Sequence, residues 1–399
     1  MSPLQALAMR LYPVESVKKE PSVKKKSAVL MMYAASEYDS NLYYAVKFSV
    51  PDPFPFFQIN GRKIILMSDL ELNRAQKQAK VDEVVSYSDI QIKAKKTGIE
   101  KPGVADVTAY FLKSKKIMKV LVPDNFNIGL ADALRKRGIG VESKPDPFFE
   151  ERVLKSKEEV RMITQSLRYT EAAIHKLEDL LKKSKIKGKF IYYGTQKVTS
   201  ELLKKVLNVS MMENNCIGSH TIVASGNQGC DPHNGGTGSV WANQSLVVDV
   251  FPRSGDTFYY ADITRTFVKG KASSALKAQY EAVKVAQEKG IDMVVPGVNG
   301  RDIHREITLE LEGRGYRTEK RDGTMVGFFH GTGHGLGLDV HEAPRVNASD
   351  HVLRKGEVVT VEPGLYYPGV GAIRIEDLLV VTDKGHQNLT VYPKKLEIA

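Results

Sequence analysis

The sequence predicts an α/β domain followed by an α+β domain. Between residues 28 and 150, short apolar runs of strand length alternate with segments of helical spacing, which is typical of α/β domains. Between residues 151 and 399, strand-like and helical segments follow one another without strict alternation, which indicates an α+β domain. A chain of 399 residues is long enough for two domains with well-buried cores.

Composition limits the class of protein. Hydrophobic residues make up 42% of the chain and charged residues 26%, as in ordinary globular proteins. No apolar run is long enough for a transmembrane helix, so no membrane association is expected. The start, "MSPLQALAMRLYPVE", lacks a compact apolar core followed by a cleavage site, and two cysteines, Cys216 and Cys230, give no disulfide framework. We therefore expect a cytoplasmic protein.

The formal net charge of +11 raises the question of nucleic-acid binding. The lysines are scattered, however, over "VKKEPSVKKK", "KAKK", "KSKK" and "LLKKSKIKGK". None of these segments is interleaved with the aromatic residues of a base-stacking surface. The pattern favours a solvated basic surface, and no nucleic-acid partner is predicted.

The first part of the chain contains an extension and the α/β domain. Residues 1–27 are charged, contain proline and have no periodicity, so we predict a loosely ordered extension. The domain over residues 28–150 ends near "KPDPFFEERVL". Its predicted strands are "SAVLMMYA", "FPFFQI", "RKIILMSD" and "KVLVPD", and its predicted helices are "DLELNRAQKQAK", "VADVTAYFLKSKK" and "NIGLADALRKRG".

A capping box opens the second domain, which covers residues 151–399. Ser156 and Glu159 have the S-x-x-E spacing that lets each side chain accept a bond from the other's backbone. The long helix that follows carries one apolar stripe, formed by Ile163, Leu167, Ile174, Leu177 and Leu181. Further helices are predicted at about 200–207, 273–290 and 300–314, and strands at "SLVVDVFP", "TFYYADITRTFV", "GEVVTVEPGLYY" and "GAIRIEDLLVVTD".

Each of these four strands carries an acidic residue inside an apolar run. They are Asp249, Asp262, Glu362 and Glu376. A buried carboxylate without compensation is very unfavourable, and a single one on a strand would usually face solvent. Four of them in the half of the chain that holds a histidine-rich loop instead indicate a shared site.

Turns can bring these carboxylates together in pairs. "RSGD" connects the strands of Asp249 and Asp262, and proline and glycine punctuate the connection between Glu362 and Glu376. Because residues two apart share a strand face, Arg374 is expected beside Glu376. Carboxylates with one imidazole form a hard ligand set that suits two divalent metal ions, manganese first, with cobalt or zinc as alternatives. Such a pair can activate water for amide hydrolysis.

The loop "HGTGHGLGLDVHEAP", residues 330–344, contains three histidines and four glycines. Its glycines alternate, so neither a dinucleotide-binding nor a Walker motif can be drawn. In "HGTGH", Gly331 stands where a zinc-protease helix has its glutamate, and the glycines disfavour a helix. The loop is therefore predicted to be a backbone that passes close to a neighbouring element and presents imidazoles.

Five motifs together resemble a known family. "IVASGNQGCDPHNG", "VVDVFPRSGDTFYYADITRT", "HGTGHGLGLDVHEAP", "VVTVEPGLYY" and "AIRIEDLLVV" are similar, in this order, to motifs of the pita-bread metallopeptidases of family M24. The resemblance is to the Xaa-Pro peptidases, aminopeptidase P and prolidase. It implies a creatinase-type N-terminal domain, a pita-bread catalytic domain, two divalent metal ions, proline-containing peptide or dipeptide substrates, and a homodimer.

The resemblance also implies roles for individual residues. The implied metal ligands are Asp249, Asp262, His334, Glu362 and Glu376, with Asp262 and Glu376 bridging. The implied catalytic residues are His233, His341 and Glu362, and the implied substrate contacts are His330, His233, His341 and Arg374. The predicted activity is hydrolysis of the bond between an N-terminal residue and proline.

Alternatives remain at several positions and for the activity. His233, His330 and His341 could each be hydrogen-bonded structural histidines, and Arg374 could orient a ligand carboxylate or contact substrate. Tyr366 and Tyr367 are interpreted as strand packing. The same fold also hosts hydrolases or lyases of other small substrates and non-enzymatic binding modules. All five ligand positions are occupied here, which disfavours a pure binding module.

Overall fold

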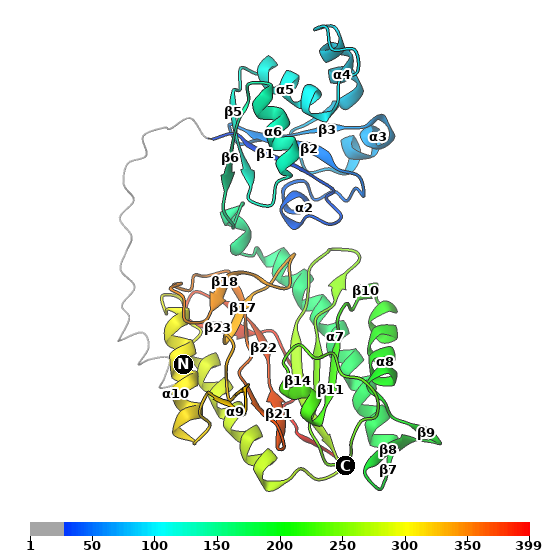
Figure 1. Ribbon diagram of the computed structural model, residues 1–399, viewed down its shortest axis with the longest axis vertical. Helices are drawn as coiled ribbons and strands as arrows, with labels where there is room; N and C mark the ends of the chain where they lie inside the picture. The colour runs from blue at the N-terminus through cyan, green and yellow to red at the C-terminus, as the bar shows by residue number, and fades with distance from the viewer. Residues whose placement is uncertain (1–27) are drawn as a thin grey trace. The chain divides into compact units, whose positions relative to one another are not determined.

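The computed structural model describes residues 28–399, and the predicted extension over residues 1–27 lies outside this part of the chain. The described residues form two compact units that divide after Arg152, and the second unit covers Val153–Ala399 (Figure 1).

The first unit is built on one six-stranded sheet of order β4-β3-β2-β1-β5-β6. Its strands are β1 (Leu30–Ala34), β2 (Phe54–Ile59), β3 (Arg62–Met67), β4 (Glu83–Ser86), β5 (Lys119–Pro123) and β6 (Gly140–Lys144). Its helices are α2 (Ser40–Val46), α3 (Asp69–Gln78), α4 (Tyr87–Lys95), α5 (Val104–Ser114) and α6 (Ile128–Lys136). The pairs β1–β5, β5–β6 and β3–β4 are parallel, so the predicted α/β character is confirmed.

The sequence predicts four of these strands and three of these helices. It misses β4 and β6, because edge strands bury few side chains and therefore show little apolar periodicity: β4 has no fully buried residue and β6 has one. It also misses α2, which spans only seven residues, and α4.

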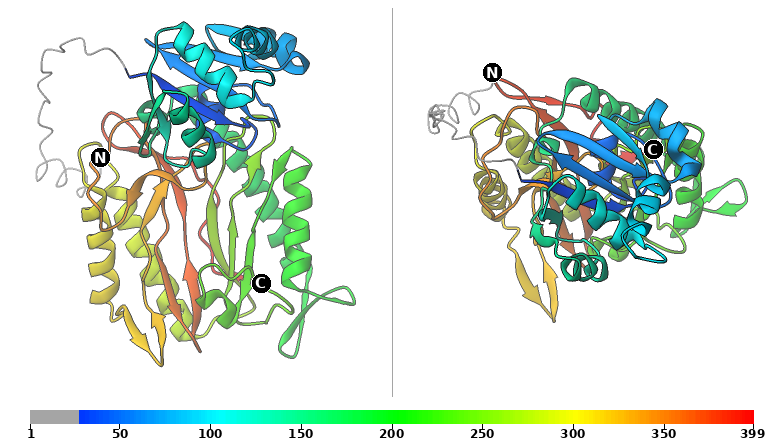
Figure 2. Two further views of the ribbon diagram at one scale, coloured as in Figure 1. Left: turned by 45° about the horizontal axis from the view of Figure 1, so that its top comes forward. Right: turned by 90° about the horizontal axis from the view of Figure 1, so that it is seen from above.

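The second unit contains two antiparallel-rich sheets, each backed by a pair of helices (Figure 2). The first sheet has the order β11-β12-β14-β24 and packs against α7 (Lys157–Lys183) and α8 (Ser200–Met212). The second has the order β18-β17-β19-β22-β23 and packs against α9 (Ser274–Asp292) and α10 (Gly300–Gly313). This mixture of helix pairs and sheets is the predicted α+β architecture.

The strands of the second unit fall into these two sheets and smaller ribbons. In the first sheet are β11 (Ile222–Ser225), β12 (Leu246–Val250), β14 (Ile263–Lys269) and β24 (Glu397–Ile398). In the second are β17 (Gly333–Gly335), β18 (Glu342–Val346), β19 (Val358–Val361), β22 (Asp377–Val381) and β23 (His386–Asn388). The ribbons are formed by β7 (Lys185–Lys187), β8 (Phe190–Tyr193), β9 (Gln196–Lys197), β10 (Cys216–Ile217), β13 (Arg253–Ser254), β15 (Glu319–Arg321), β16 (Thr324–Val326), β20 (Gly364–Tyr367) and β21 (Gly371–Arg374).

The predicted capping box begins α7. The Ser156 hydroxyl accepts from the Glu159 amide at 3.3 Å, and the Glu159 carboxylate accepts from the Ser156 amide at 2.8 Å. The predicted apolar stripe is buried along its whole length, in Ile163, Leu167, Ile174, Leu177 and Leu181. The helices predicted at 200–207, 273–290 and 300–314 are confirmed as α8, α9 and α10, and α8 continues to Met212.

Three predicted strands differ from the observed ones. "GEVVTVEPGLYY" is two strands, β19 and β20, because Pro363 has no N–H with which to continue the ladder. "GAIRIEDLLVVTD" is also two strands, β21 and β22, and the chain between them carries Glu376. "TFYYADITRTFV" becomes a strand only at Ile263, so Asp262 precedes β14. Three of the four acidic positions therefore lie at strand ends rather than inside strands.

A buried arginine joins the two sheets. Arg265 on β14 is 1% exposed and pairs with Asp377 on β22 at 2.8 Å. The same guanidinium donates to the backbone oxygens of Thr264 and Tyr392 at 2.9 and 2.7 Å. Because these bonds satisfy a charge that would otherwise be unpaired in the core, Arg265 fixes β14 against β22.

We expect Arg265→Met to lower the free energy of unfolding by about 3 kcal/mol, the lower end of the range for breaking a buried pair, since Asp377 loses this partner but keeps Lys394 at 3.0 Å. Arg161→Met removes an exposed pair with Glu158 on α7, and its effect should stay within about 1 kcal/mol. Urea denaturation of both variants measures the difference. Equal effects would show that Arg265 does not hold the sheets together.

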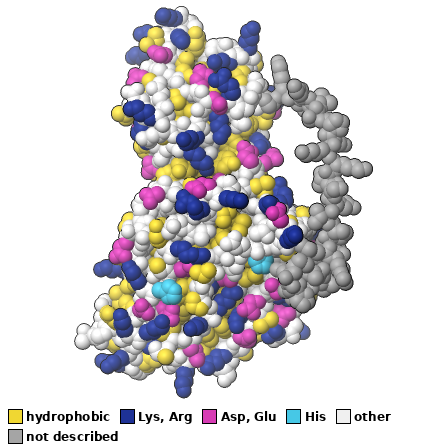
Figure 3. Space-filling model, turned by 180° about the vertical axis from the view of Figure 1, so that it is seen from behind, with side chains coloured by type: hydrophobic (Ala, Val, Ile, Leu, Met, Phe, Trp, Pro, Cys, Tyr) yellow, Lys and Arg dark blue, Asp and Glu magenta, His cyan; other side chains and the backbone are white. Residues whose placement is uncertain are grey.

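Charged side chains are distributed widely on the surface. Lys and Arg are mixed with Asp and Glu over the face displayed, without a single dominant basic patch there (Figure 3). Among residues 28–399, no helix combines the length and apolar character required to cross a bilayer.

Candidate metal centre

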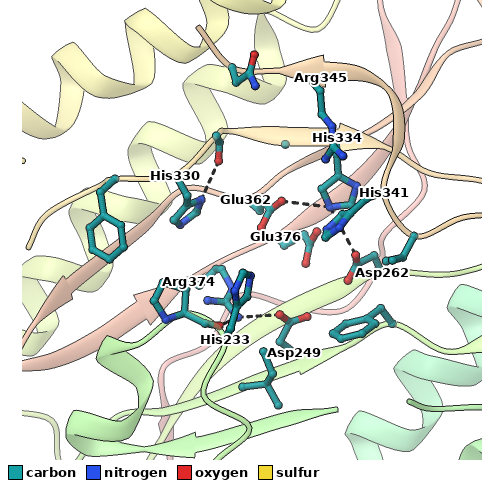
Figure 4. Close-up of a pocket in the computed structure, with 18 residues that line it drawn as sticks. His233, Asp249, Asp262, His330, His334, His341, Arg345, Glu362, Arg374 and Glu376 are labelled. Carbon is teal, nitrogen blue, oxygen red and sulfur yellow. Dashed lines mark hydrogen bonds and ion pairs between the residues drawn. The ribbon is translucent and has the colours of Figure 1, made fainter. Parts of the chain in front are cut away.

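The two central sheets supply the predicted carboxylates in matching ways. Asp249 lies in β12 opposite Thr264 of β14, and Asp262 immediately precedes β14. In the second sheet, Glu362 follows β19 and Glu376 precedes β22, which are likewise antiparallel neighbours. Each sheet therefore contributes two acidic residues from one antiparallel strand pair to a common space (Figure 4).

The glycines around His334 allow three strands to converge. A Cβ at Gly333 would lie 2.0 Å from the Thr360 carbonyl oxygen, and one at Gly335 would lie 2.2 Å from the Ala343 carbonyl oxygen. No side chain fits at either position, so the alternating glycines of this loop are explained by close backbone approach. The His334 amide also donates to the Thr360 hydroxyl at 3.1 Å, which fixes the imidazole within the cavity.

The structure brings the five predicted ligands together in one cavity of about 540 Å³. Ligand atoms of Asp262, His334 and Glu376 all lie within 4.8 Å of one another. His334 Nε2 is 3.3 Å from Glu362 Oε1 and 3.8 Å from Asp262 Oδ2. Asp249 lines the same cavity. Asp262, His334 and Glu376 are each no more than 4% exposed, so the cluster is shielded from bulk water.

The carboxylates fit the requirements of a cation site. Asp249 Oδ2 accepts from Arg374 at 2.7 Å, and Glu376 Oε2 accepts from the Thr264 hydroxyl at 2.8 Å. The other oxygens, Asp249 Oδ1 and Glu376 Oε1, are buried and have no hydrogen-bond partner among the described residues, and the same holds for Asp262 Oδ1. Buried anionic oxygens require compensation, and divalent metal ions supply it.

The pKa values of the carboxylates reflect their burial and their closeness to one another. Burial, followed by the charge of Glu376, raises the pKa of Asp262 well above its usual range. Burial and the charge of Glu362 do the same to the pKa of Glu376. Burial also acts to raise the pKa of Glu362, but the hydrogen bond and charge of His334 outweigh it and lower that pKa. The protein alone therefore opposes full ionisation of the cluster, which bound cations would favour.

A hydrogen-bonded chain runs from Asp249, a predicted ligand, to His330. Arg374 NH1 donates to the Tyr366 hydroxyl at 3.0 Å, and that hydroxyl lies 2.8 Å from His330 Nε2. His330 Nδ1 is 2.8 Å from the Gly331 carbonyl oxygen, which accepts its proton. Nε2 is then the acceptor for the tyrosine O–H.

Tyr366 was interpreted as strand packing, and this interpretation is incomplete. Its ring is fully buried, but its hydroxyl links Arg374 to His330. A weak signal for this in the sequence is Pro363, which separates β19 from β20, the strand that carries Tyr366. Arg374 both donates to Asp249 and lines the cavity, so its position is compatible with each of the two alternatives for that residue, and both stay predictions.

His233 and His341 lie on opposite sides of the cavity (Figure 4). The loop of His233 is held by Arg374, which donates to the Pro232 carbonyl oxygen at 3.4 Å. The His341 ring packs edge-on against His334, with 4.3 Å between ring centroids and 83° between planes. Burial, with the neighbouring charges of His334 and Arg345, lowers the pKa of His341 to about 4.

Arg345 and the apolar wall of the cavity were not predicted from the sequence. Arg345 lies on β18 opposite His334 and lines the cavity. No carboxylate among the described residues forms an ion pair with it, so its charge is available to a ligand. The apolar lining residues are Ile222, Phe251, Phe329 and Val340. The cavity therefore combines a cluster of carboxylates, a free cation and an apolar wall.

Two helix-backed sheets with carboxylates converging between them define a metal-dependent hydrolase of the pita-bread type. Residues 161–383 match the model of metallopeptidase family M24. The chain belongs to this family. Divalent metal ions are accordingly part of its chemistry.

Individual relatives agree with this assignment. The chain is 30% identical over 304 residues to an Xaa-Pro dipeptidase of Pyrococcus horikoshii. The aligned residues cover 72% of this chain and 77% of that protein. Its fold is similar to that of an Xaa-Pro dipeptidase from Bacillus anthracis, with a TM-score of 0.77, 25% identity and coverage of 93% and 95% of the two chains. An X-Pro aminopeptidase from Thermotoga maritima shares the fold with a TM-score of 0.76, 21% identity and coverage of 98% and 100%.

We expect Asp262→Asn to change stability in opposite directions with and without metal ions. Because the folded state raises the pKa of Asp262, its ionised form opposes folding at pH 7, by about 1.4 kcal/mol per pKa unit. In the metal-free protein, Asp262→Asn should therefore raise the free energy of unfolding. This gain should disappear as the pH falls toward the unfolded pKa near 4, where wild-type Asp262 is protonated in both states.

With manganese present the order should reverse, because the ion binds the folded wild-type protein more tightly than the variant. Urea denaturation with chelator and with manganese measures both effects. A variant that is less stable under both conditions would show that the carboxylates are not electrostatically crowded.

Proposed function

We propose that this protein is a metal-dependent exopeptidase that hydrolyses the bond between an N-terminal residue and a following proline. The observation that carries the proposal is the trio of buried carboxylate oxygens that have no hydrogen-bond partner within residues 28–399, placed beside His334 in a cavity large enough for a short peptide. Two relatives with this fold are Xaa-Pro dipeptidases, which supports proline-containing peptides as the substrate class.

Two divalent metal ions would be held by the five residues Asp249, Asp262, His334, Glu362 and Glu376. We propose Asp262 and Glu376 as the shared ligands, since they are the two most buried of the carboxylates. The oxygen-rich set favours manganese, with cobalt or zinc as alternatives. When bound, the ions lower the pKa of water and draw charge from the scissile carbonyl.

The side chains around the ligands would complete the reaction. Proline is a tertiary amide, so its nitrogen must be protonated as it departs. We assign this proton transfer to the Glu362 carboxylate, whose position between His334 and the open cavity lets it accept a proton and pass it on. The His341 imidazole would donate an N–H to the developing oxyanion. Arg374 fixes Asp249 through the 2.7 Å bond, which keeps one ligand oxygen directed away from the ion site.

Substrate contacts are proposed for His233, His330, His341 and Arg374, which all line the cavity. We further propose the domain limits 28–150 and 151–399, a homodimer, and a cytoplasmic protein without a nucleic-acid partner.

Replacing a ligand should abolish both metal binding and turnover. We expect Asp262→Asn and His334→Ala to lower kcat/KM for Xaa-Pro substrates by more than about 100-fold, since even partners that only orient ligands are worth this much. The assay uses metal-stripped protein refilled with manganese, cobalt or zinc, with metal content measured in parallel and circular dichroism to verify folding.

Asp256→Asn is the matched control, because Asp256 is exposed in the same connection between Asp249 and Asp262. It should retain normal activity. Near-normal cleavage by either ligand variant would overturn the site, and inactivity of the wild-type protein with every metal would overturn the proposed activity.

The position of Arg345 favours dipeptides, rather than longer peptides, as substrates of the proposed exopeptidase. A dipeptide carries its carboxylate directly on the proline, whereas a longer peptide carries it further from the scissile bond. Arg345 is the lining cation that lacks a carboxylate partner among the described residues, so a substrate carboxylate would complete its ion pair. A charge-assisted hydrogen bond of this kind contributes about 1.5–3 kcal/mol.

We therefore expect Arg345→Gln to lower kcat/KM for an Xaa-Pro dipeptide by about 10–100-fold, the equivalent of that bond energy. The same variant should leave hydrolysis of the corresponding Xaa-Pro amide nearly unchanged, because the amide has no terminal carboxylate. Steady-state kinetics on the matched pair of substrates gives the comparison. An equal loss on both substrates would exclude carboxylate recognition by Arg345.

A further inference from the structure

A buried ion pair lies directly behind His341 and is not part of the ligand set. The ammonium of Lys155 contacts Glu342, the residue that follows His341. The Lys155 side chain is 1% exposed and that of Glu342 is 9% exposed. Lys155 immediately precedes the capping box of α7, so a residue distant in sequence is connected to the histidine-bearing loop.

The imidazole of His341 has little direct support of its own. It packs against His334 but forms no side-chain hydrogen bond among the described residues, and the residue is exposed on the cavity side. Its position therefore depends on the backbone of residues 337–342.

Glu342 holds that backbone. Its Oε1 binds Lys155, and its Oε2 accepts from the Asp339 amide at 3.4 Å. Asp339 in turn accepts from the Gly337 amide at 3.1 Å, and the Gly337 carbonyl oxygen accepts from the Tyr260 amide at 2.8 Å. Tyr260 stands two residues before the ligand Asp262. The Glu342 carboxylate thus connects the 337–342 loop to Lys155. Backbone hydrogen bonds of the same loop connect it to Tyr260, close to Asp262.

Lys155 is fixed and closely packed. Its amide donates to the Gly356 carbonyl oxygen at 2.7 Å, and its ammonium also donates to the Val153 carbonyl oxygen at 3.3 Å. A Cβ at Gly337 would lie 2.6 Å from Glu342 Oε1 and 3.0 Å from Lys155 Cε, so the loop passes over the pair without room for a side chain. The pair therefore acts as a rigid support under the loop.

We propose that Lys155 is a positioning residue for the reaction: through Glu342 it holds the 337–342 loop so that the His341 imidazole faces the metal ligands. The inference rests on the proposed function for the role of His341. Removing Lys155 takes away the ammonium that contacts the Glu342 carboxylate at a site where both side chains are nearly inaccessible, and breaking a buried pair in this way is unfavourable. The 337–342 loop must then shift so that the Glu342 carboxylate reaches solvent, and the His341 imidazole moves with the loop.

The test compares Lys155→Met with the double variant Lys155→Met/Glu342→Gln, both as metal-loaded enzyme. We expect Lys155→Met to lower kcat by about 10–100-fold, the size of effect produced by a displacement near 1 Å. KM should change much less than kcat, because the other proposed substrate contacts stay in place and the oxyanion contact of His341 is made only in the transition state. Metal content should be unchanged. Amide hydrogen exchange of residues 337–342 should become faster, and this readout does not depend on activity.

The double variant separates positioning from stability. It removes both charges of the Lys155–Glu342 pair, so its urea midpoint should recover toward the wild-type value, while kcat should remain low because the ammonium–carboxylate tether is absent. Glu171→Gln is the matched control: Glu171 is a buried carboxylate that pairs with Arg168 and lies outside the site. It should lower stability without changing kcat.

Recovery of kcat together with stability in the double variant would overturn the proposal, as would normal kcat and normal exchange in Lys155→Met. If the wild-type protein cleaves no Xaa-Pro substrate, the proposed function fails. The exchange data would still show whether Lys155 holds the loop.

Discussion

The crowding of four carboxylates in one cavity of the second unit is the constraint on which the rest of that unit depends. Asp262 and Glu376 are almost inaccessible to solvent. Burial and the charges of neighbouring carboxylates raise the pKa values of both residues. A fold can keep such a cluster only if positive charge reaches it. Arg374 supplies part of that charge from the protein, and bound divalent ions would supply the remainder. The helix pairs, the buried Arg265 and the glycines beside His334 all hold the donors near one another against this repulsion.

Much of the site could be predicted because acidic residues in apolar runs are unusual. The capping box, the apolar stripe of α7 and the four acidic positions were readable from local spacing. The strand breaks at Glu362 and Glu376 were not. Both depend on where a neighbouring sheet lies: the Glu376 amide, for example, donates to the Thr264 carbonyl oxygen of the other sheet at 3.1 Å. Periodicity along one segment carries no information about such a partner.

The residues that support the ligands were harder to predict than the ligands. Tyr366 and Arg345 have ordinary sequence surroundings, and their importance follows from what they face in space. Lys155 stands 187 positions from Glu342, and only the folded chain shows that the two charges meet. The alternating glycines of the histidine-rich loop are an intermediate case. Their pattern indicated close backbone approach, while the neighbours, Thr360 and Ala343, emerged from the structure.

The strand breaks at Glu362 and Glu376 separate the predicted metal ligands from a neighbouring two-stranded ribbon. The proposed metal donors Glu362 and Glu376 stand beside the strands of the central sheet, whereas Tyr366 and Arg374 belong to the separate β20–β21 ribbon between those two points. Substitutions in the ribbon can therefore alter the hydrogen bonds of Tyr366 with His330 and of Arg374 with Asp249 while the strands of the central sheet keep their pairing.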